Sequence, residues 1–168
     1  FRGPPSAFMG PPTPEIDAEW YHLAKIFNFG VDYPVLKALN RTQGAIKYPG
    51  TGVYQAGMEV FHQLHCLNYI RMYTYQDHYG NTDYDMIGET PEERQRHKDH
   101  CIENIRQRLM CAPDLNVYTY HWLPESTLPH GHLFTRHQCV EWDSFYAWAE
   151  NSAINSPPLS KPNDAETL

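Results

Sequence analysis

One ten-residue pattern occurs twice in this sequence, and its residue types are those that bind metal ions. Residues 62–71 read HQLHCLNYIR and residues 97–106 read HKDHCIENIR, so both fit His-x-x-His-Cys-(Leu/Ile)-x-x-Ile-Arg. Imidazole and thiolate groups are ligands for zinc and copper. A second copy with the same flanking residues is hard to obtain by chance. The repeat therefore predicts a metal site rather than two unrelated histidine pairs.

Both copies lie in stretches with a helical pattern, and helix geometry places their ligating side chains on one face. At about 100° per residue, His62, His65 and Cys66 fall within an arc of about 100°. Tyr69 lies one turn further along this face, whereas Arg71 points away. If the two helices pack antiparallel through these faces, the ligating groups of both copies converge at the crossing. These groups are His62, His65, His97, His100, Cys66 and Cys101.

The cysteines of the repeat permit two interpretations. As thiolates they would complete a mixed His/Cys zinc or copper site, which a cytosolic protein would favour. As a disulfide, Cys66–Cys101 would join the helices at their crossing. The even count of four Cys and the sequon that begins at Asn40, an N-glycosylation acceptor, favour the disulfide and an oxidising secretory compartment. Cys111 and Cys139 would then form a second disulfide that fastens the last helix to the second repeat helix.

The ligand set also bears on which metal is bound. Neutral imidazoles suit zinc, copper, iron or nickel, and an all-His set argues against structural zinc because such sites usually include Cys. Asp99 lies about 60° beyond His100 on the helix, outside the arc, so an iron triad of two His and one carboxylate is not indicated. Copper fits an oxidising compartment best, with zinc as the alternative. We expect one copper between the helices, with one copper for each His pair as the alternative.

Helices separated by long loops must position these groups. Hydrophobic periodicity and capping signals predict helices over 14–27, 58–76, about 91–110 and about 139–151, with one helical turn at 34–39. Residues 117–122 are β-prone and predict one strand. The sequence predicts loops for the rest of residues 28–52 and for residues 77–90. The predicted fold class is mainly α. We expect a small, disulfide-stapled helical domain with two antiparallel metal-bearing helices, long loops and little β structure.

Length and composition indicate one acidic domain. A chain of 168 residues is long enough for one sizeable core. We expect an extended N-terminal lead-in at 1–13, a single catalytic domain at 14–152, and a flexible tail at 153–168. Thirteen Lys+Arg against 20 Asp+Glu give a net charge of −7, which disfavours nucleic acid as a partner. No stretch approaches the roughly 18 apolar residues of a membrane span, and because the chain opens at Phe1, a targeting or anchoring segment is expected to have been removed.

The doubled motif resembles the paired HxxHC signatures of the UstYa-like family of fungal mycotoxin and natural-product biosynthesis. The resemblance covers about residues 13–148 and includes blocks at 14–20, 60–68, 97–102, 106–114 and 137–139. Family members usually have an N-terminal membrane anchor. The resemblance therefore implies a domain in the lumen of the secretory pathway, anchored through a segment absent from this chain.

The activity implied by this resemblance is copper- and oxygen-dependent oxidation of C–H bonds in a peptide or polyketide intermediate. Oxidative cyclisation, hydroxylation, dehydrogenation and halogenation are the reaction types, and the implied metal ligands are His62, His65, His97 and His100. The expected partner is a small-molecule or peptide natural-product substrate, and a homo-oligomer is a further option. Two other functions stay open: a zinc- or copper-binding module without catalysis, and a metal-free cyclase that uses His as general acid and base.

Two residues outside the ligand set are candidates for a catalytic role. Tyr69 faces the predicted metal and is suited to relay an electron or to hydrogen-bond an oxygen species, although packing against the partner helix is the alternative. His137 belongs to a block that resembles the family and is a candidate ligand or acid/base group. Residues 118–132 are rich in Tyr, His and Pro and do not resemble the family blocks. We expect this segment to shape a substrate pocket.

Overall fold

The computed structural model describes residues 6–80, 83 and 85–155, and its elements are mainly helical. In chain order they are α1 (Pro14–Leu23), β1 (Asn28–Val31), α2 (Tyr33–Ala38), β2 (Tyr54–Gly57), α3 (Glu59–Thr74), α4 (Gln76–Tyr79), α5 (Pro91–Cys111), β3 (Thr119–His121), β4 (His130–His132) and α6 (Trp142–Ser152). The predicted mainly α class is confirmed. Within the described residues, no helix is long and apolar enough to cross a membrane.

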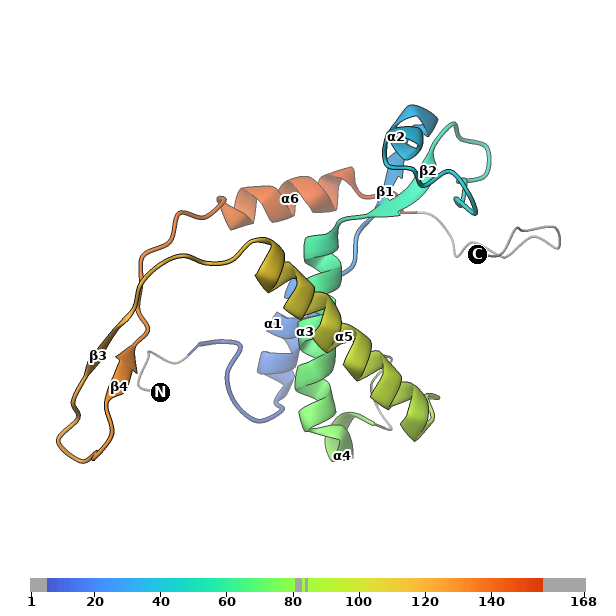
Figure 1. The fold of residues 1–168 in the computed structure, drawn as a ribbon. Coiled ribbons are helices and arrows are strands. Elements are labelled where there is room, and N and C mark those ends of the chain that lie inside the picture. The colour runs from blue at the N-terminus through green and yellow to red at the C-terminus, as the bar shows by residue number, and fades with distance from the viewer. Residues whose placement is uncertain (1–5, 81–82, 84, 156–168) are drawn as a thin grey trace.

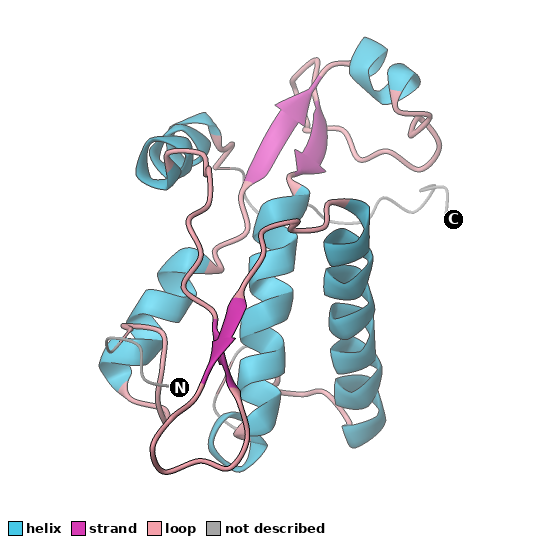
Figure 2. Cartoon of the chain, turned by 60° about the vertical axis from the view of Figure 1, so that its left-hand side comes forward, coloured by secondary structure: helices cyan, strands magenta, loops and turns pink. Residues whose placement is uncertain are grey.

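Helices α3 and α5 form the centre of the molecule and run antiparallel, with α1 on another side of α3 (Figure 1). Figure 2 shows α3 and α5 side by side. The capping box predicted for α5 is present, since the Thr90 side chain accepts from the backbone of Glu93 and the Glu93 carboxylate accepts from the backbone of Thr90. These contacts fix where α5 begins, and therefore how its histidines align with those of α3.

The core consists of two clusters along α3. One lies at the α3–α5 contact and comprises Cys66, Tyr69, Met72, Tyr79, Met86 and Cys101. The other is aromatic and comprises Phe27, Phe29, Phe61, Tyr146 and Ala149. Phe61 is fully buried at the start of α3, where its ring stacks on Phe145 at 5.7 Å between centroids and meets Phe27 edge-on at 4.8 Å. Both ends of α3 are thus held by packed side chains.

A partly buried polar network joins α1, α3 and α4 on the side of α3 that faces away from the histidines. The Arg71 guanidinium donates to the carboxylate of Asp17 and to the hydroxyl of Tyr79, and Tyr79 also donates to Asp17. Arg71 also lies over the ring of Trp20, 5.6 Å from its centroid. The prediction that Arg71 points away from the ligating face is therefore confirmed.

The structure differs from the sequence prediction in residues 24–57. The first helix ends at Leu23 rather than at residue 27, because the chain leaves the helix after Ala24 and places Phe27 in the aromatic cluster. The predicted loop contains β1, which pairs antiparallel with β2 from Asn28 opposite Gly57 to Val31 opposite Tyr54. These four-residue strands carry too short an alternation to be distinguished from loop in the sequence.

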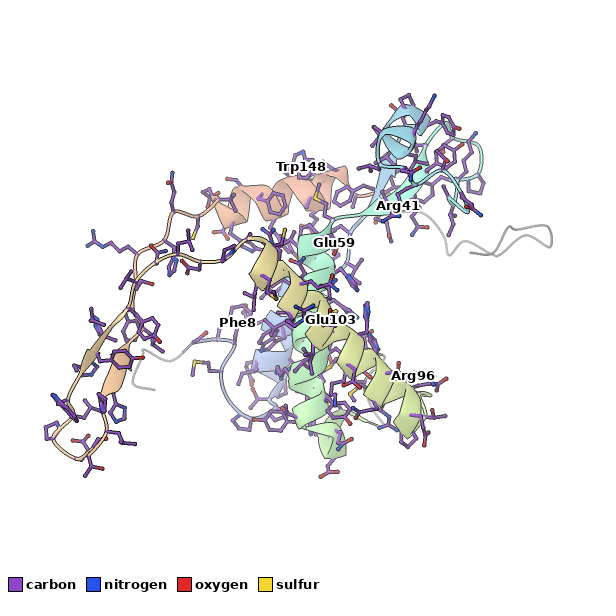
Figure 3. All side chains as sticks on the ribbon, in the orientation of Figure 1. Phe8, Arg41, Glu59, Arg96, Glu103 and Trp148 are labelled. Carbon is purple, nitrogen blue, oxygen red and sulfur yellow. The ribbon has the colours of Figure 1, made fainter. Side chains whose placement is uncertain are left out.

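Residues 112–141, which we call the arm, extend away from the helices and carry strands β3 and β4 (Figure 1). The predicted strand is present as β3, and the sequence analysis missed its antiparallel partner β4. No residue of the arm is buried, and its side chains project into open space on both sides (Figure 3). The described part of the arm is therefore held by its own strand pairing rather than by a hydrophobic core.

The two predicted terminal segments are described only in part. In the lead-in, the Trp20 indole donates to the carbonyl oxygen of Phe8 at 3.0 Å, and the two rings meet edge-on. In the tail, the backbone of Ile154 donates to Asn28. The remainder of the predicted flexible tail, residues 156–168, lies outside the described residues.

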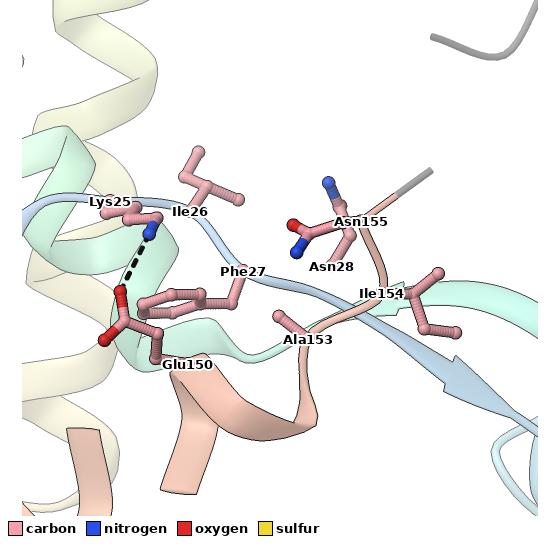
Figure 4. Close-up of a pocket in the computed structure, with 8 residues that line it drawn as sticks. All are labelled: Lys25, Ile26, Phe27, Asn28, Glu150, Ala153, Ile154 and Asn155. Atoms are coloured by element: carbon pink, nitrogen blue, oxygen red, sulfur yellow. Dashed lines mark hydrogen bonds and ion pairs between the residues drawn. The ribbon is translucent and has the colours of Figure 1, made fainter. Parts of the chain in front are cut away.

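A small pocket of about 200 Å³ lies where the end of α6 meets the start of β1. The ion pair between Lys25 and Glu150, 3.0 Å long, closes one side, and the Phe27 ring lies beside it (Figure 4). None of its lining residues belongs to the repeat, so this pocket is separate from the histidines.

Truncation of Phe61 should test whether the aromatic cluster holds the start of α3. We expect Phe61→Ala to lower the free energy of unfolding by about 3–5 kcal/mol, because a fully buried ring leaves a cavity. The matched control is Phe134→Ala in the exposed arm, which should change stability by less than about 0.5 kcal/mol. Urea unfolding followed by circular dichroism measures both. Equal losses in the two variants would contradict the assignment of this core.

Stability should fall at alkaline pH because burial, with the hydrogen bond to Asp17, raises the pKa of Tyr79 above its usual value near 10. In the unfolded chain this phenol ionises above about pH 10, whereas in the folded protein it stays protonated. The protonated Tyr79 phenol therefore makes its full contribution to the free energy of unfolding below pH 10. This contribution is lost as the pH rises, by up to about 1.4 kcal/mol per pH unit. Urea midpoints across this range should fall less steeply for Tyr79→Phe than for the exposed control Tyr33→Phe. Identical slopes would contradict the prediction.

Candidate metal centre

The four histidines of the repeat come together where α3 and α5 pack. The ring centroids of His62 and His100 are 5.5 Å apart, and those of His65 and His97 are 5.9 Å apart. Within α3, the rings of His62 and His65 are 6.5 Å apart. Each close pair therefore takes one ring from each helix, as the antiparallel arrangement predicts. The convergence of the imidazoles is confirmed, while metal binding stays a prediction.

We call His62 and His100 the outer pair and His65 and His97 the inner pair. Cys66 lies beside the outer pair. Potential ligand atoms of His62, Cys66 and His100 all lie within 4.8 Å of one another, and the Cys66 sulfur is 3.8 Å from Nε2 of His62. Burial raises the pKa of the Cys66 thiol, so the folded chain favours the protonated form. Because a metal binds the thiolate, the imidazoles are the readier ligands here.

The cysteines differ from the sequence prediction. All four are free thiols in the structure, so neither the Cys66–Cys101 nor the Cys111–Cys139 disulfide is formed in it. Cys66 and Cys101 are fully buried in the same cluster, and burial, with the neighbouring Cys66 thiol, raises the pKa of Cys101. Cys111 and Cys139 are exposed at the two ends of the arm. Since the arm buries none of its residues, no core packing brings its two ends together.

Carboxylates from the segment between α4 and α5 face the inner pair of histidines. Nδ1 of His97 lies 3.2 Å from Oε1 of Glu89, and Nδ1 of His65 lies 3.7 Å from Oδ2 of Asp85. Both acids lie outside the two motif copies, so the motif pattern did not predict them. Their position in the short connection between the two repeat helices was the available signal.

The inner histidines are also the better shielded ones. The side chain of His65 is 16% exposed, whereas that of His62 is 37% exposed. Burial lowers the pKa of His65, although Asp85 opposes the shift, so the neutral ring that a metal requires is favoured near pH 7. Burial likewise raises the pKa of Asp85. The site is thus more shielded at its inner end than at its outer end.

Tyr69 lies at the inner end of the site. It is fully buried, its ring lies on that of His97 at 3.8 Å between centroids, and its hydroxyl donates to Oε2 of Glu89 at 2.6 Å. Burial and this hydrogen bond raise the pKa of Tyr69, which keeps the phenol protonated. The hydroxyl therefore already has an acceptor, and the observed contacts fit the packing alternative for this residue.

His137 is placed in the arm and has partners of its own. Its Nδ1 lies 2.9 Å from the Asn116 amide and 3.2 Å from Asp114, and its Nε2 lies 2.9 Å from the Thr135 hydroxyl. These partners come from the arm and not from the repeat. A ligand or acid/base role for His137 stays a prediction.

Two further predicted features lie on the surface. Asn40 is exposed just after α2, in the left-handed conformation with φ 54°, so the sequon is accessible to a glycosyltransferase. In the arm, the rings of His121 and His132 are 5.8 Å apart, and His130 contacts the Ser126 hydroxyl at 2.8 Å. Glycosylation and the predicted role of 118–132 in a substrate pocket both stay predictions.

Comparisons with known proteins place this chain among fungal biosynthetic proteins. Residues 1–152 match the family model described as "Mycotoxin biosynthesis protein UstYa". The "UstYa family oxidase phomYc" of Diaporthe leptostromiformis is 33% identical over 156 residues, which is 89% of this chain and 60% of that protein. The "UstYa family oxidase aprY" of Aspergillus flavus is 25% identical over 170 residues, which is 92% of this chain and 50% of that protein.

A relative with a different printed activity also matches. The "Transacylase cctO" of Talaromyces islandicus is 33% identical over 121 residues, which is 64% of this chain and 39% of that protein. The chain thus spans about 60% or less of these relatives. No solved structure matches the chain.

The burial of the thiols predicts two classes of reactivity in protein kept reduced. Cys111 and Cys139 should react with a thiol reagent such as DTNB within seconds, because both are exposed. Cys66 and Cys101 should react only when the protein unfolds, because they are fully buried with raised pKa values. Stopped-flow absorbance with and without guanidinium measures both phases, and Cys66→Ser should remove signal from the slow phase alone. Four equally fast thiols would contradict the burial of the pair.

Proposed function

The chain belongs to the UstYa family, and on this premise we propose that it is a copper-dependent oxidoreductase of fungal secondary metabolism. Its substrate is a peptide or polyketide intermediate, oxidised at a C–H bond with molecular oxygen as co-substrate. The observation that carries the proposal is the convergence of four imidazoles from a doubled motif at one helix crossing. Cyclisation, hydroxylation, dehydrogenation and halogenation are all compatible with this site.

The donor set fits copper. Imidazole nitrogens bind copper well, and four imidazole rings face one another across two packed helices. Nδ1 of His65 and of His97 faces a carboxylate, which leaves the Nε2 atoms for a metal. His62, His65, His97 and His100 would hold the ion, and Cys66 is within reach of the outer pair. Bound copper would supply one-electron redox chemistry.

The chain's own residues define how a substrate reaches this site. His65 and Tyr69 shield the inner end, which limits access of water from that side. His62 and His100 lie at the outer end and are more exposed, so a substrate would approach from there. Hydrogen bonds from substrate polar groups to an unligated ring nitrogen would orient it. The more open outer end thus suits a substrate that is too large for the protein to enclose.

Two alternatives have distinct support. One relative is named a transacylase, and acyl transfer changes no oxidation state, which is compatible with a metal-free reaction in which a histidine acts as general acid and base. The convergence of the four imidazoles also suits a copper- or zinc-binding module without catalysis. Metal analysis combined with oxygen uptake separates the three, since only an oxidase requires copper and consumes oxygen.

The cellular setting is part of the proposal. We place the protein in the lumen of the secretory pathway, with Asn40 glycosylated, because the sequon is exposed. Expression in a eukaryotic secretory host should give a protein whose mass falls after treatment with an N-glycosidase. Asn40→Gln should remove that difference.

The ligand assignment predicts the effect of single histidine substitutions. His62→Ala and His97→Ala should each weaken copper binding more than tenfold and abolish oxygen uptake, since even losses outside the ligand shell cost about 10–100-fold. The helices should persist, because neither residue belongs to the two core clusters. His130→Ala in the arm is the control for copper binding and should keep the wild-type copper affinity.

Chelator competition measures copper affinity, mass spectrometry of the metal content measures stoichiometry, and circular dichroism checks the fold. We expect one copper per chain in the wild type. Full oxygen uptake in either site variant would rule out the four-histidine site. Two coppers per chain, both lost on substitution of all four histidines, would replace one shared ion with one ion for each pair.

A further inference from the structure

Glu89 contacts both repeat helices at the inner end of the site. Its Oε1 lies 3.2 Å from Nδ1 of His97 on α5, and its Oε2 accepts from the hydroxyl of Tyr69 on α3 at 2.6 Å. Because each oxygen has its own partner, the carboxylate cannot rotate without losing a hydrogen bond. We propose that Glu89 is a positioning residue that presents Nε2 of His97 to the metal. This inference rests on the proposed metal-binding function.

The backbone of Glu89 is itself fixed. The residue directly precedes Thr90, the N-cap of α5, and its carbonyl oxygen accepts from the Arg94 side chain at 3.2 Å. Its backbone N–H donates to Met86, which is fully buried. The carboxylate is therefore supported by the same helix that carries His97, so their spacing does not depend on a free loop.

Hydrogen bonding determines which ring nitrogen of His97 is available. A carboxylate only accepts, so Nδ1 of a neutral His97 must carry the proton to bond to Oε1 of Glu89. Nε2 then keeps its lone pair, which is the requirement for a metal ligand. The Tyr69 ring, 3.8 Å from that of His97, fixes the plane of the imidazole. The hydrogen bond and the ring contact together set both tautomer and orientation.

This support is specific to one copy of the repeat. Of the acids that the structure describes, only Glu89 lies within ordinary hydrogen-bond distance of a repeat histidine. Asp85 is 3.7 Å from His65, and Glu59 is 3.7 Å from His62 and 76% exposed. The motif is symmetric in sequence, but its copies are not equally oriented, and His97 is the most firmly placed of the four.

The direct test is the tautomer of His97 in metal-free protein at pH 8, read from long-range ¹H–¹⁵N correlation spectra. The wild type should show the Nδ1–H form, and Glu89→Ala should shift His97 toward the Nε2–H form. Copper affinity from chelator competition should fall about 10–100-fold in Glu89→Ala. Glu89→Gln, whose amide oxygen still accepts from Nδ1 of His97, should lose less copper affinity than Glu89→Ala. Glu92→Ala, which removes the same charge from the exposed first turn of α5, should change neither readout.

Two results would overturn the inference. One is the Nε2–H tautomer at His97 in the wild type, a measurement that requires no variant to fold. The other is equal copper affinity in Glu89→Ala and Glu92→Ala. If the wild type instead shows the Nδ1–H form, lost in Glu89→Ala, but binds no copper, the copper proposal fails while the positioning of His97 by Glu89 stands.

Discussion

The close packing of α3 against α5 is the contact on which the rest of the structure depends. Two of the side chains in this contact are small, since Cys66 and Cys101 are both fully buried there beside Tyr69 and Met72. Larger residues at these positions would separate the helices and move the imidazoles apart. The cysteines therefore have a packing role whatever their redox state, and each histidine pair lies beside them because it shares their helix face.

Contacts outside the metal centre hold helix α3 in place. Phe61 fixes its start in the aromatic cluster, and Arg71 fixes its other end through Asp17 and Tyr79. A helix anchored at both ends can present His62 and His65 without help from an ion. This agrees with a site whose ligands are in place before metal binds, which lowers the entropy lost on binding.

Identical motifs acquire different surroundings in this fold. The inner histidines face carboxylates and are shielded, whereas the outer ones are more exposed and lie beside Cys66. The difference arises because Asp85 and Glu89 lie at one end of the helix pair only, beside His65 and His97. The symmetric repeat thus produces an asymmetric site, with a fixed inner end and an accessible outer end.

The sequence alone determined the local features: the helices of the repeat, the capping box at Thr90, and the face shared by His62, His65 and Cys66. These follow from helical periodicity and from hydrogen bonds between residues close in the chain. The tertiary structure decided the placement of Glu89 beside His97, the burial of Cys66 and Cys101 as free thiols in place of the predicted disulfide, and the pairing of β1 with β2. Each joins residues from separate elements, so it depends on how the elements pack, which no local pattern encodes.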